Sequence, residues 1–186
     1  MRWSLAVVTV VWLGLIAAGG YELFVFETTA GAAGLGTSRW PDAVTLTRAP
    51  VGLTVVLFAH PGCACTRASL AELESSLADA PVRPRVIVAF VGPTDPTASA
   101  AWQAAGRIAG AARVRLGAAE ARRFGARTSG HVAIYDETGA LRFAGGVTGS
   151  RGHVGANVGR QAVRAALRGA PGLASHAVFG CALEDD

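Results

Sequence analysis

The sequence contains no lysine, since all 17 of its basic side chains other than histidine belong to arginine. No segment ends in the Gly-Lys-Ser/Thr of a nucleotide-binding P-loop, and no serine lies in the Gly-x-Ser-x-Gly turn of many hydrolases. The net charge is only +4, and the arginines are scattered without interleaved aromatic side chains. A nucleic-acid surface normally shows a denser basic stripe, so we expect no nucleic-acid partner.

A long apolar run occurs only at the N-terminus. Residues 3–21 form 19 positions without a charged side chain, close to the roughly 20 that a helix needs to cross a bilayer. Arg2 is the only charge before them, so the positive-inside tendency predicts a cytoplasmic N-terminus. A signal peptide cleaved near Ala17-Ala18-Gly19 is the alternative. Because apolar sequence continues past Glu22, we favour an uncleaved transmembrane anchor over residues 1–26.

This anchor places the remaining chain at the inner (cytoplasmic) membrane as a single-pass protein, facing the periplasm or the cell exterior. Such compartments are oxidising, and disulfides persist there. Residues 27–42 are small, Gly-rich and aperiodic, which is typical of a flexible tether. We expect one domain over residues 43–170, followed by a C-terminal tail over residues 171–186 that carries Cys181.

The domain alternates strand-like and helix-like segments. Strands are expected at residues 43–47, 52–59, 85–92 and 113–116, and in a hairpin formed by residues 131–136 and 141–146. Helices are expected from Thr66 to the Pro-containing segment at residue 81, and at residues 98–109, 118–124 and 155–168. This order predicts an α/β fold with a mixed central sheet flanked by helices on both faces.

Two cysteines, Cys63 and Cys65, lie one residue apart where a buried strand gives way to a helix. Unpaired N–H groups at a helix N-terminus favour the thiolate, which is the nucleophilic form. We expect Cys63 just before or at the helix cap and Cys65 within the first turn. Arg67 would add positive charge, and His60 would stabilise a thiolate or move its proton.

Cys181 is the odd cysteine of three, so only one internal disulfide can form at a time. Three uses are open: it resolves a disulfide with Cys63 or Cys65, it binds a metal with them, or it remains a free thiol. The metal would be Cu(I), which prefers soft thiolates, because zinc sites favour four ligands with longer spacing. The ligands would then be Cys63, Cys65, Cys181 and His153.

A glycine-rich segment at residues 145–160 connects the expected hairpin to the last helix. Such a loop can cradle an anion, and it would bring Arg151, His153 and Asn157 close to the cysteines. The alternative is a surface turn that only caps the last helix.

The order of strand, cysteine pair, helix, hairpin and final helix resembles the thioredoxin fold. The segment HPGCACTRASLAEL at residues 60–73, together with residues 125–153 and the Phe-Gly-Cys at 179–181, more narrowly resembles membrane-anchored, thioredoxin-like bacterial proteins often labelled RedB. The resemblance covers roughly residues 43–183. It implies thiol–disulfide exchange in which Cys63 attacks and Cys65 resolves, with exported protein thiols or disulfides as partners and no cofactor.

Two departures separate the chain from thioredoxins. Thioredoxins carry Cys-x-x-Cys, whereas a single residue separates Cys63 and Cys65. Gly130 stands near the position of the proline that precedes the hairpin in thioredoxins, which exchanges fixed geometry for backbone freedom. We therefore expect substrate docking to differ. The main hypothesis is a membrane-anchored thiol–disulfide oxidoreductase, and the alternatives are a copper(I) chaperone and a non-catalytic thioredoxin-fold binding module.

The close spacing of Cys63 and Cys65 predicts an oxidising disulfide. One intervening residue closes a tight ring, and departure from the preferred disulfide dihedral stores strain that makes the bond easier to reduce. We expect its midpoint potential to lie above the value of about −270 mV that is typical of thioredoxin. Alkylation of thiols across a glutathione series measures this potential, and a midpoint as low as that of thioredoxin contradicts the prediction.

Overall fold

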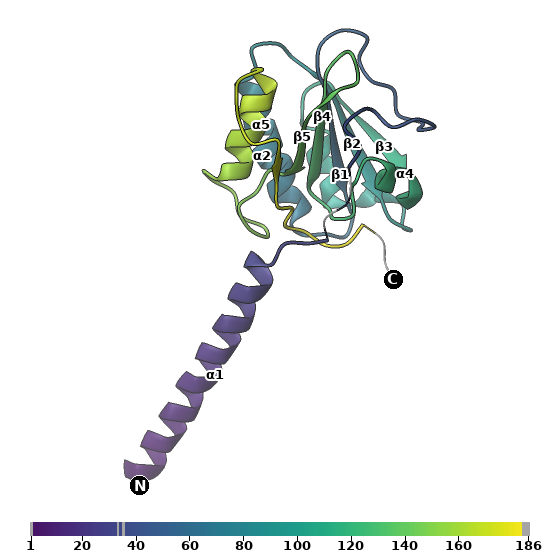
Figure 1. The fold of residues 1–186 in the computed structure, drawn as a ribbon. Helices are drawn as coiled ribbons and strands as arrows, with labels where there is room; N and C mark the ends of the chain where they lie inside the picture. The colour runs from purple at the N-terminus through teal and green to yellow at the C-terminus, as the bar shows by residue number, and fades with distance from the viewer. Residues whose placement is uncertain (1, 33, 35, 184–186) are drawn as a thin grey trace.

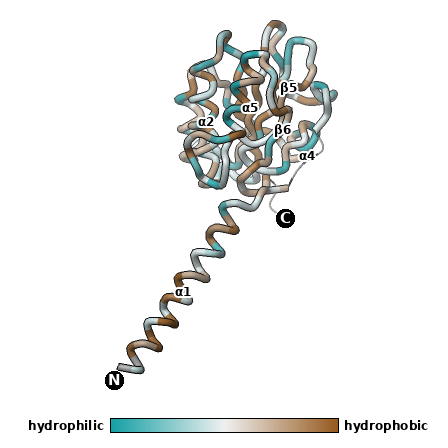
Figure 2. Tube along the Cα trace, turned by 60° about the vertical axis from the view of Figure 1, so that its left-hand side comes forward, coloured by the Kyte–Doolittle hydropathy of each residue, from teal (hydrophilic) through white to brown (hydrophobic). Residues whose placement is uncertain are grey.

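A computed structural model describes residues 2–32, 34 and 36–183. Its first element is the long helix α1 (Arg2–Thr28), which extends away from the rest of the protein (Figure 1). The stretch Leu5–Thr28 is long and apolar enough to cross a membrane, with a mean hydropathy of 1.8, and none of it is buried against the domain. Figure 2 shows this apolar character along most of the helix. The helix ends two residues beyond the predicted anchor.

The domain is built on one mixed six-stranded sheet, as predicted. Its strands are β1 (Thr54–Ala59), β2 (Arg85–Val91), β3 (Ala111–Leu116), β4 (His131–Tyr135), β5 (Leu141–Gly146) and β6 (Ser175–His176), in the order β3-β2-β1-β4-β5-β6. Strands β1, β2 and β3 are parallel, β4 runs antiparallel to both β1 and β5, and β6 is parallel to β5. The expected hairpin is confirmed as β4 and β5. The short β6 lies in the segment that we expected to be a tail.

Helices cover both faces of the sheet. They are α2 (Thr66–Ala78), α3 (Ala100–Ala105), α4 (Ala118–Arg123) and α5 (Val158–Leu167), with a short 3-10 helix at Pro96–Ala98. Side chains of β1 alternate between two cores. Val55 and Leu57 pack in the core with α2, α3 and α5, whereas Val56 and Phe58 pack in the core beneath α4. The continuous apolar run of β1 thus reflects burial on both faces.

The prediction of a strand at residues 43–47 is wrong. The backbone polar groups of this segment are bound by side chains of α4 instead of by a neighbouring strand. The Glu120 carboxylate accepts the N–H of Thr45 at 2.6 Å and its hydroxyl at 3.0 Å, and Arg123 donates to the carbonyl of Ala43. Leu46 packs into the core on the α4 side. The segment therefore crosses the face of the sheet rather than joining its edge.

Gly31 and Trp40, both within the expected tether, contact the domain. The N–H of Gly31 donates to the carbonyl of Val178 at 2.8 Å. The Trp40 ring packs edge-on against Phe124 and Tyr135, with both centroid distances at 5.1 Å. Contacts of this kind between aromatic rings are favourable, so Trp40 helps to hold its otherwise glycine-rich segment against the domain.

Glu72 fixes the loop before α5 to the centre of α2. This carboxylate is fully buried, accepts the N–H of Gly155 at 2.6 Å, and pairs with Arg160 at 3.2 Å. A buried charge needs such partners because the interior solvates it poorly. The contact sets the course of the loop that carries Arg151.

We predict that Glu72→Ala destabilises the full chain by about 3–5 kcal/mol, because removing one member of a buried pair leaves the other uncompensated. Urea unfolding in detergent micelles measures the change. Glu74→Ala is the matched control, since Glu74 lies outside the buried face of the same helix. Equal stability of the two variants contradicts a role for Glu72 in holding the loop.

Candidate thiol site

Cys63 and Cys65 lie in the connection between the carboxyl end of β1 and the start of α2. Cys65 is itself the N-cap residue of α2. Cys63 therefore lies just before the cap, as expected, whereas Cys65 lies at the cap rather than within the first turn. The N–H of Cys63 donates to the carbonyl of His60 at 3.2 Å, and its carbonyl accepts the N–H of Thr66 at 3.1 Å. These bonds form a tight turn that leaves Cys63 only 4% exposed.

Ser129 joins this turn to the segment before β4. Its hydroxyl accepts the N–H of His60 at 2.9 Å and lies 2.8 Å from the hydroxyl of Thr66. The next residue, Gly130, donates its N–H to the carbonyl of Phe58 at 2.8 Å. Ser129 and Thr66 are not among the predicted site residues. The sequence does carry a signal for Ser129, because the polar Thr-Ser-Gly directly precedes a strand that is apolar on both faces.

The C-terminal segment pairs with the same residues and reaches the cysteines. Its pairing is antiparallel: the N–H of Ser129 donates to the carbonyl of Cys181 at 2.8 Å, and the N–H of Leu183 donates to the carbonyl of Arg127 at 2.9 Å. A Cβ on Gly180 would lie 2.0 Å from the carbonyl oxygen of Ser129, so only glycine permits this approach. Three cysteines from two distant parts of the chain therefore meet.

The thiol of Cys63 has a lowered pKa. Burial alone would raise it, but hydrogen bonds to its sulfur outweigh burial. The donors are the S–H and N–H of Cys181, the N–H of Cys65 and the hydroxyl of Thr66. Hydrogen bonds to the charged form stabilise it, so Cys63 is the one of the three cysteines whose ionisation these contacts favour.

The other two thiols have raised pKa values. Desolvation raises the pKa of Cys65, and the negative charge of Cys63 and the hydrogen bond that Cys65 donates to it raise it further. The same causes, desolvation first, raise the pKa of Cys181 to about 12. The site thus holds one thiol of lowered pKa and two neighbouring thiols that donate hydrogen bonds to it.

Arg151 places a positive charge near Cys65 and Cys181. Its positive charge opposes the rise in the pKa values of Cys65 and Cys181. The guanidinium donates to the carbonyl of Gly180 and, through Nε, to the carbonyl of Phe26 at 2.9 Å. It also stacks over the Phe26 ring, 4.8 Å from the ring centroid. Arg151 therefore connects the thiols to the last turns of α1.

The remaining predicted residues of the glycine-rich loop have structural roles. His153 is exposed, and its N–H bonds within the loop to Ser150 at 3.4 Å. Asn157 is the N-cap of α5, where its side chain accepts the N–H of Arg160 at 2.9 Å. The loop therefore caps the last helix, as the second alternative expected, and it also carries Arg151.

His60, Arg67 and Gly130 surround the cysteine turn. The Nδ1 atom of His60 accepts the N–H of Gly62 at 3.2 Å. Arg67 is exposed and lines, with Cys63, a hollow of about 210 Å³. Gly130 has a φ of +91°, and a Cβ there would lie 2.6 Å from the hydroxyl oxygen of Ser69. The backbone at this position therefore requires glycine.

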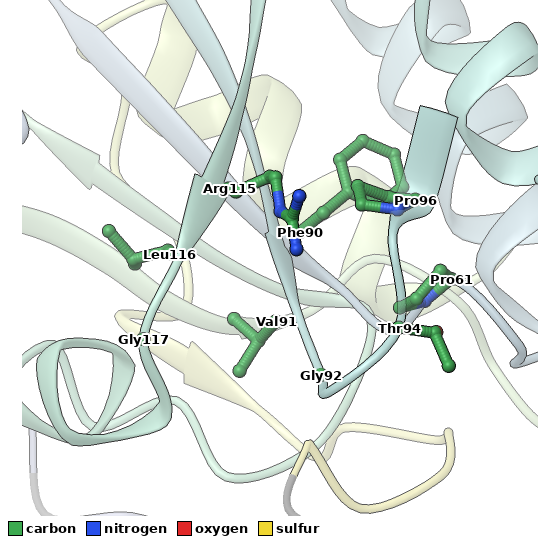
Figure 3. A pocket seen from close by; sticks show the side chains of 9 residues that line it. All are labelled: Pro61, Phe90, Val91, Gly92, Thr94, Pro96, Arg115, Leu116 and Gly117. Carbon is green, nitrogen blue, oxygen red and sulfur yellow. The ribbon is translucent and has the colours of Figure 1, made fainter. Parts of the chain in front are cut away.

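A second hollow opens at the carboxyl ends of β2 and β3 (Figure 3). Its volume is about 250 Å³, and no cysteine lines it. Pro61 borders both hollows and therefore lies between them. Arg115, on its wall, pairs with Asp95 at 3.7 Å. We assign no chemical function to this hollow.

The described residues include no group of three or more His, Cys, Asp or Glu side chains arranged to hold a metal ion. The candidate copper ligands Cys63, Cys65, Cys181 and His153 are among the residues covered by this statement.

No protein-family model matches the chain, and no curated protein is similar to it. Two solved structures share its fold. A hypothetical protein from Sinorhizobium meliloti 1021 has a TM-score of 0.57 and 19% identity, over 81% of this chain and 96% of that one. An uncharacterized conserved protein from Geobacillus kaustophilus has a TM-score of 0.55 and 15% identity, over 86% of this chain and 93% of that one. At these identities the likeness concerns the fold alone.

We predict that Cys181→Ala raises the pKa of Cys63, because a hydrogen-bond donor to its thiolate is lost. The measurement is the alkylation rate of Cys63 as a function of pH, mapped by mass spectrometry. The burial of Cys63 lowers its alkylation rate at every pH, but the pH at which the rate is half-maximal still reports the pKa of Cys63. Thr97→Ala, which changes an exposed residue away from the cysteines, is the control. A midpoint that stays in place or moves down contradicts the assignment.

Proposed function

We propose that the chain is a thiol–disulfide oxidoreductase of thioredoxin-like fold, similar to the RedB-like proteins, that works through Cys63 and Cys65. The observation that carries the proposal is the electrostatic asymmetry of the thiols. Cys63 has a lowered pKa and Cys65 a raised one, and Cys65 donates its S–H to Cys63. A nucleophilic cysteine needs thiolate character, and its resolving partner needs a position within reach.

The architecture supports the same function. The cysteine turn follows the central strand β1, which is parallel to β2 and antiparallel to β4. The turn therefore lies at the carboxyl end of a parallel strand pair, where open α/β sheets commonly bind ligands. Residues 127–130, just before β4, border the turn through the hydroxyl of Ser129.

The chemistry proceeds by two sulfur exchanges. The Cys63 thiolate attacks a disulfide of an exported partner protein, forms a mixed disulfide and releases one partner sulfur as a thiolate. The Cys65 thiol loses its proton to water, attacks the sulfur of Cys63, and releases the second partner sulfur, and both released thiolates take up protons. Two electrons thus pass from Cys63 and Cys65 to the partner disulfide, and a second exported dithiol restores them by the reverse steps.

The apolar helix α1 supports a membrane location. Arg2 precedes its apolar stretch, so we place the N-terminus in the cytoplasm and the domain in the periplasm or at the cell exterior. An oxidising compartment supplies disulfide-bonded partners.

We predict that Cys63→Ser abolishes reduction of a disulfide-bonded test protein, such as insulin, by the full chain in micelles. Cys65→Ser is the matched variant, because it retains the nucleophile and is expected to accumulate a mixed disulfide on Cys63. Electrophoresis without reductant, with mass mapping, identifies that species. Full activity of Cys63→Ser contradicts the proposal. Tight stoichiometric binding of Cu(I) by a protein without exchange activity would favour the copper chaperone instead.

A further inference from the structure

We propose that Cys181 is a third redox cysteine, which forms a disulfide with Cys63 in competition with Cys65. The inference rests on the proposed exchange function and adds a second resolving residue to the same site. It follows from the way in which the C-terminal segment is held, from the atoms that Cys181 contacts, and from the ring that each disulfide would close.

Backbone contacts fix Cys181 on both sides. After it, Ala182 forms an antiparallel bridge with Thr128, and Leu183 bonds to Arg127. Before it, Gly180 is buried against Ser129, and its carbonyl accepts a hydrogen bond from Arg151. A loose terminal cysteine would have none of these contacts. The position of the Cys181 sulfur is therefore set by the fold.

The fold brings Cys181 directly to the nucleophile. Both its S–H and its N–H donate to the sulfur of Cys63. Cys65 also donates its S–H to Cys63, so two thiols contact the atom that a resolving cysteine must attack. Cys181 is the more exposed of the two, which leaves it accessible to solvent when it loses its proton.

The two bridges close very different rings. A Cys63–Cys65 disulfide encloses a single residue and must distort the turn at the start of α2. Cys181 approaches from a separate segment that is already paired with residues 127–129, so a Cys63–Cys181 disulfide closes no short ring. Ring strain makes a disulfide easier to reduce, and the Cys63–Cys181 bridge is therefore the more stable of the two.

Resolution by Cys181 conserves atoms and electrons. A mixed disulfide joins Cys63 to the partner protein, and Cys181 gives its proton to water. The Cys181 thiolate attacks the sulfur of Cys63, the Cys63–partner bond breaks, and the partner sulfur leaves as a thiolate and takes up a proton. Cys63 and Cys181 have together lost two electrons to the partner disulfide. Where Cys65 resolves the mixed disulfide first, the Cys181 thiolate attacks the sulfur of Cys63 in the strained bridge. The Cys63–Cys65 bond breaks, Cys65 leaves as a thiolate and takes up a proton, and the bridge moves to Cys63–Cys181.

Arg151 is the positioning residue for this step. Its charge favours the thiolate of Cys181, and its guanidinium holds the carbonyl of the preceding Gly180. The same side chain donates to the carbonyl of Phe26, so the segment that carries Cys181 is held to the end of α1 as well as to the domain.

The experiment traps the internal disulfides of the full chain in micelles. Protein equilibrated across a glutathione series is quenched in acid, alkylated, digested and mapped by mass spectrometry. We expect Cys63–Cys181 peptides from the wild type and from Cys65→Ser. A mixed disulfide between Cys63 and glutathione should resolve at least about tenfold more slowly in Cys65→Ser/Cys181→Ser than in Cys65→Ser, because a thiol held in place acts at high effective concentration.

The matched control moves the thiol by one residue. In Cys65→Ser/Cys181→Ser/Ala182→Cys the chain keeps its cysteine count relative to Cys65→Ser, but successive side chains of an extended segment point to opposite sides. We expect no bridge between Cys63 and the thiol that this triple variant carries at position 182. If the control resolves the mixed disulfide as fast as Cys65→Ser, chain flexibility rather than position explains the reaction, and the inference is overturned.

Failure of the inference is distinguishable from failure of the proposed function. A Cys63–Cys65 bridge in the wild type, with no Cys63–Cys181 bridge in Cys65→Ser, overturns the third cysteine and leaves two-cysteine exchange in place. Absence of every internal disulfide across the whole series overturns both.

Discussion

The site depends on the hydroxyl group of Ser129. It accepts the N–H of His60 from the cysteine turn and meets the hydroxyl of Thr66 from the first turn of α2. The N–H of the same residue holds the carbonyl of Cys181. Ser129, which is buried, thus joins its own segment to two others that are far apart in the sequence, the turn at residues 60–66 and the segment that carries Cys181. Buried polar groups require partners, so these segments must adopt their positions together or leave several groups unsatisfied.

The difference in pKa among the cysteines follows from the contacts that Ser129 makes. Side chains of identical chemistry acquire different pKa values because only Cys63 receives donors from both neighbouring segments. Cys65 and Cys181 supply donors to Cys63, and the pKa values of their own thiols are raised. Each thiolate raises the pKa of a neighbouring thiol, so the three cysteines do not ionise together readily. The hydrogen bonds of the surrounding segments therefore decide which cysteine ionises most easily.

Local patterns predicted the elements whose burial is continuous or periodic. The runs that became β1 and β2, the start of α2 at Thr66 and the hairpin of β4 and β5 were all readable from apolar and turn residues. Long-range contacts decided the rest. β6 exists because Gly145 and Gly146 carry no side chain, since a Cβ on either would lie 2.3 Å from a carbonyl oxygen of the incoming segment. Residues 43–47 have strand-like composition, but Glu120 captures their backbone groups. The meeting of Cys181 with Cys63 depends on the same kind of distant pairing, which spacing alone does not encode.

The packing of the segment after α1 limits where an anchored domain can work. If residues 27–42 were a free, flexible chain, their root-mean-square end-to-end distance would be about 22 Å, and the domain could move over a comparable range. Trp40 and the contacts of Gly31 remove most of that freedom, and Arg151 ties the domain to Phe26. With α1 in a bilayer, the thiols stay at a nearly constant height above the lipid. Under the proposed function, encounters would then depend on lateral diffusion in two dimensions, and partners would be selected by how far above the membrane they carry their own cysteines.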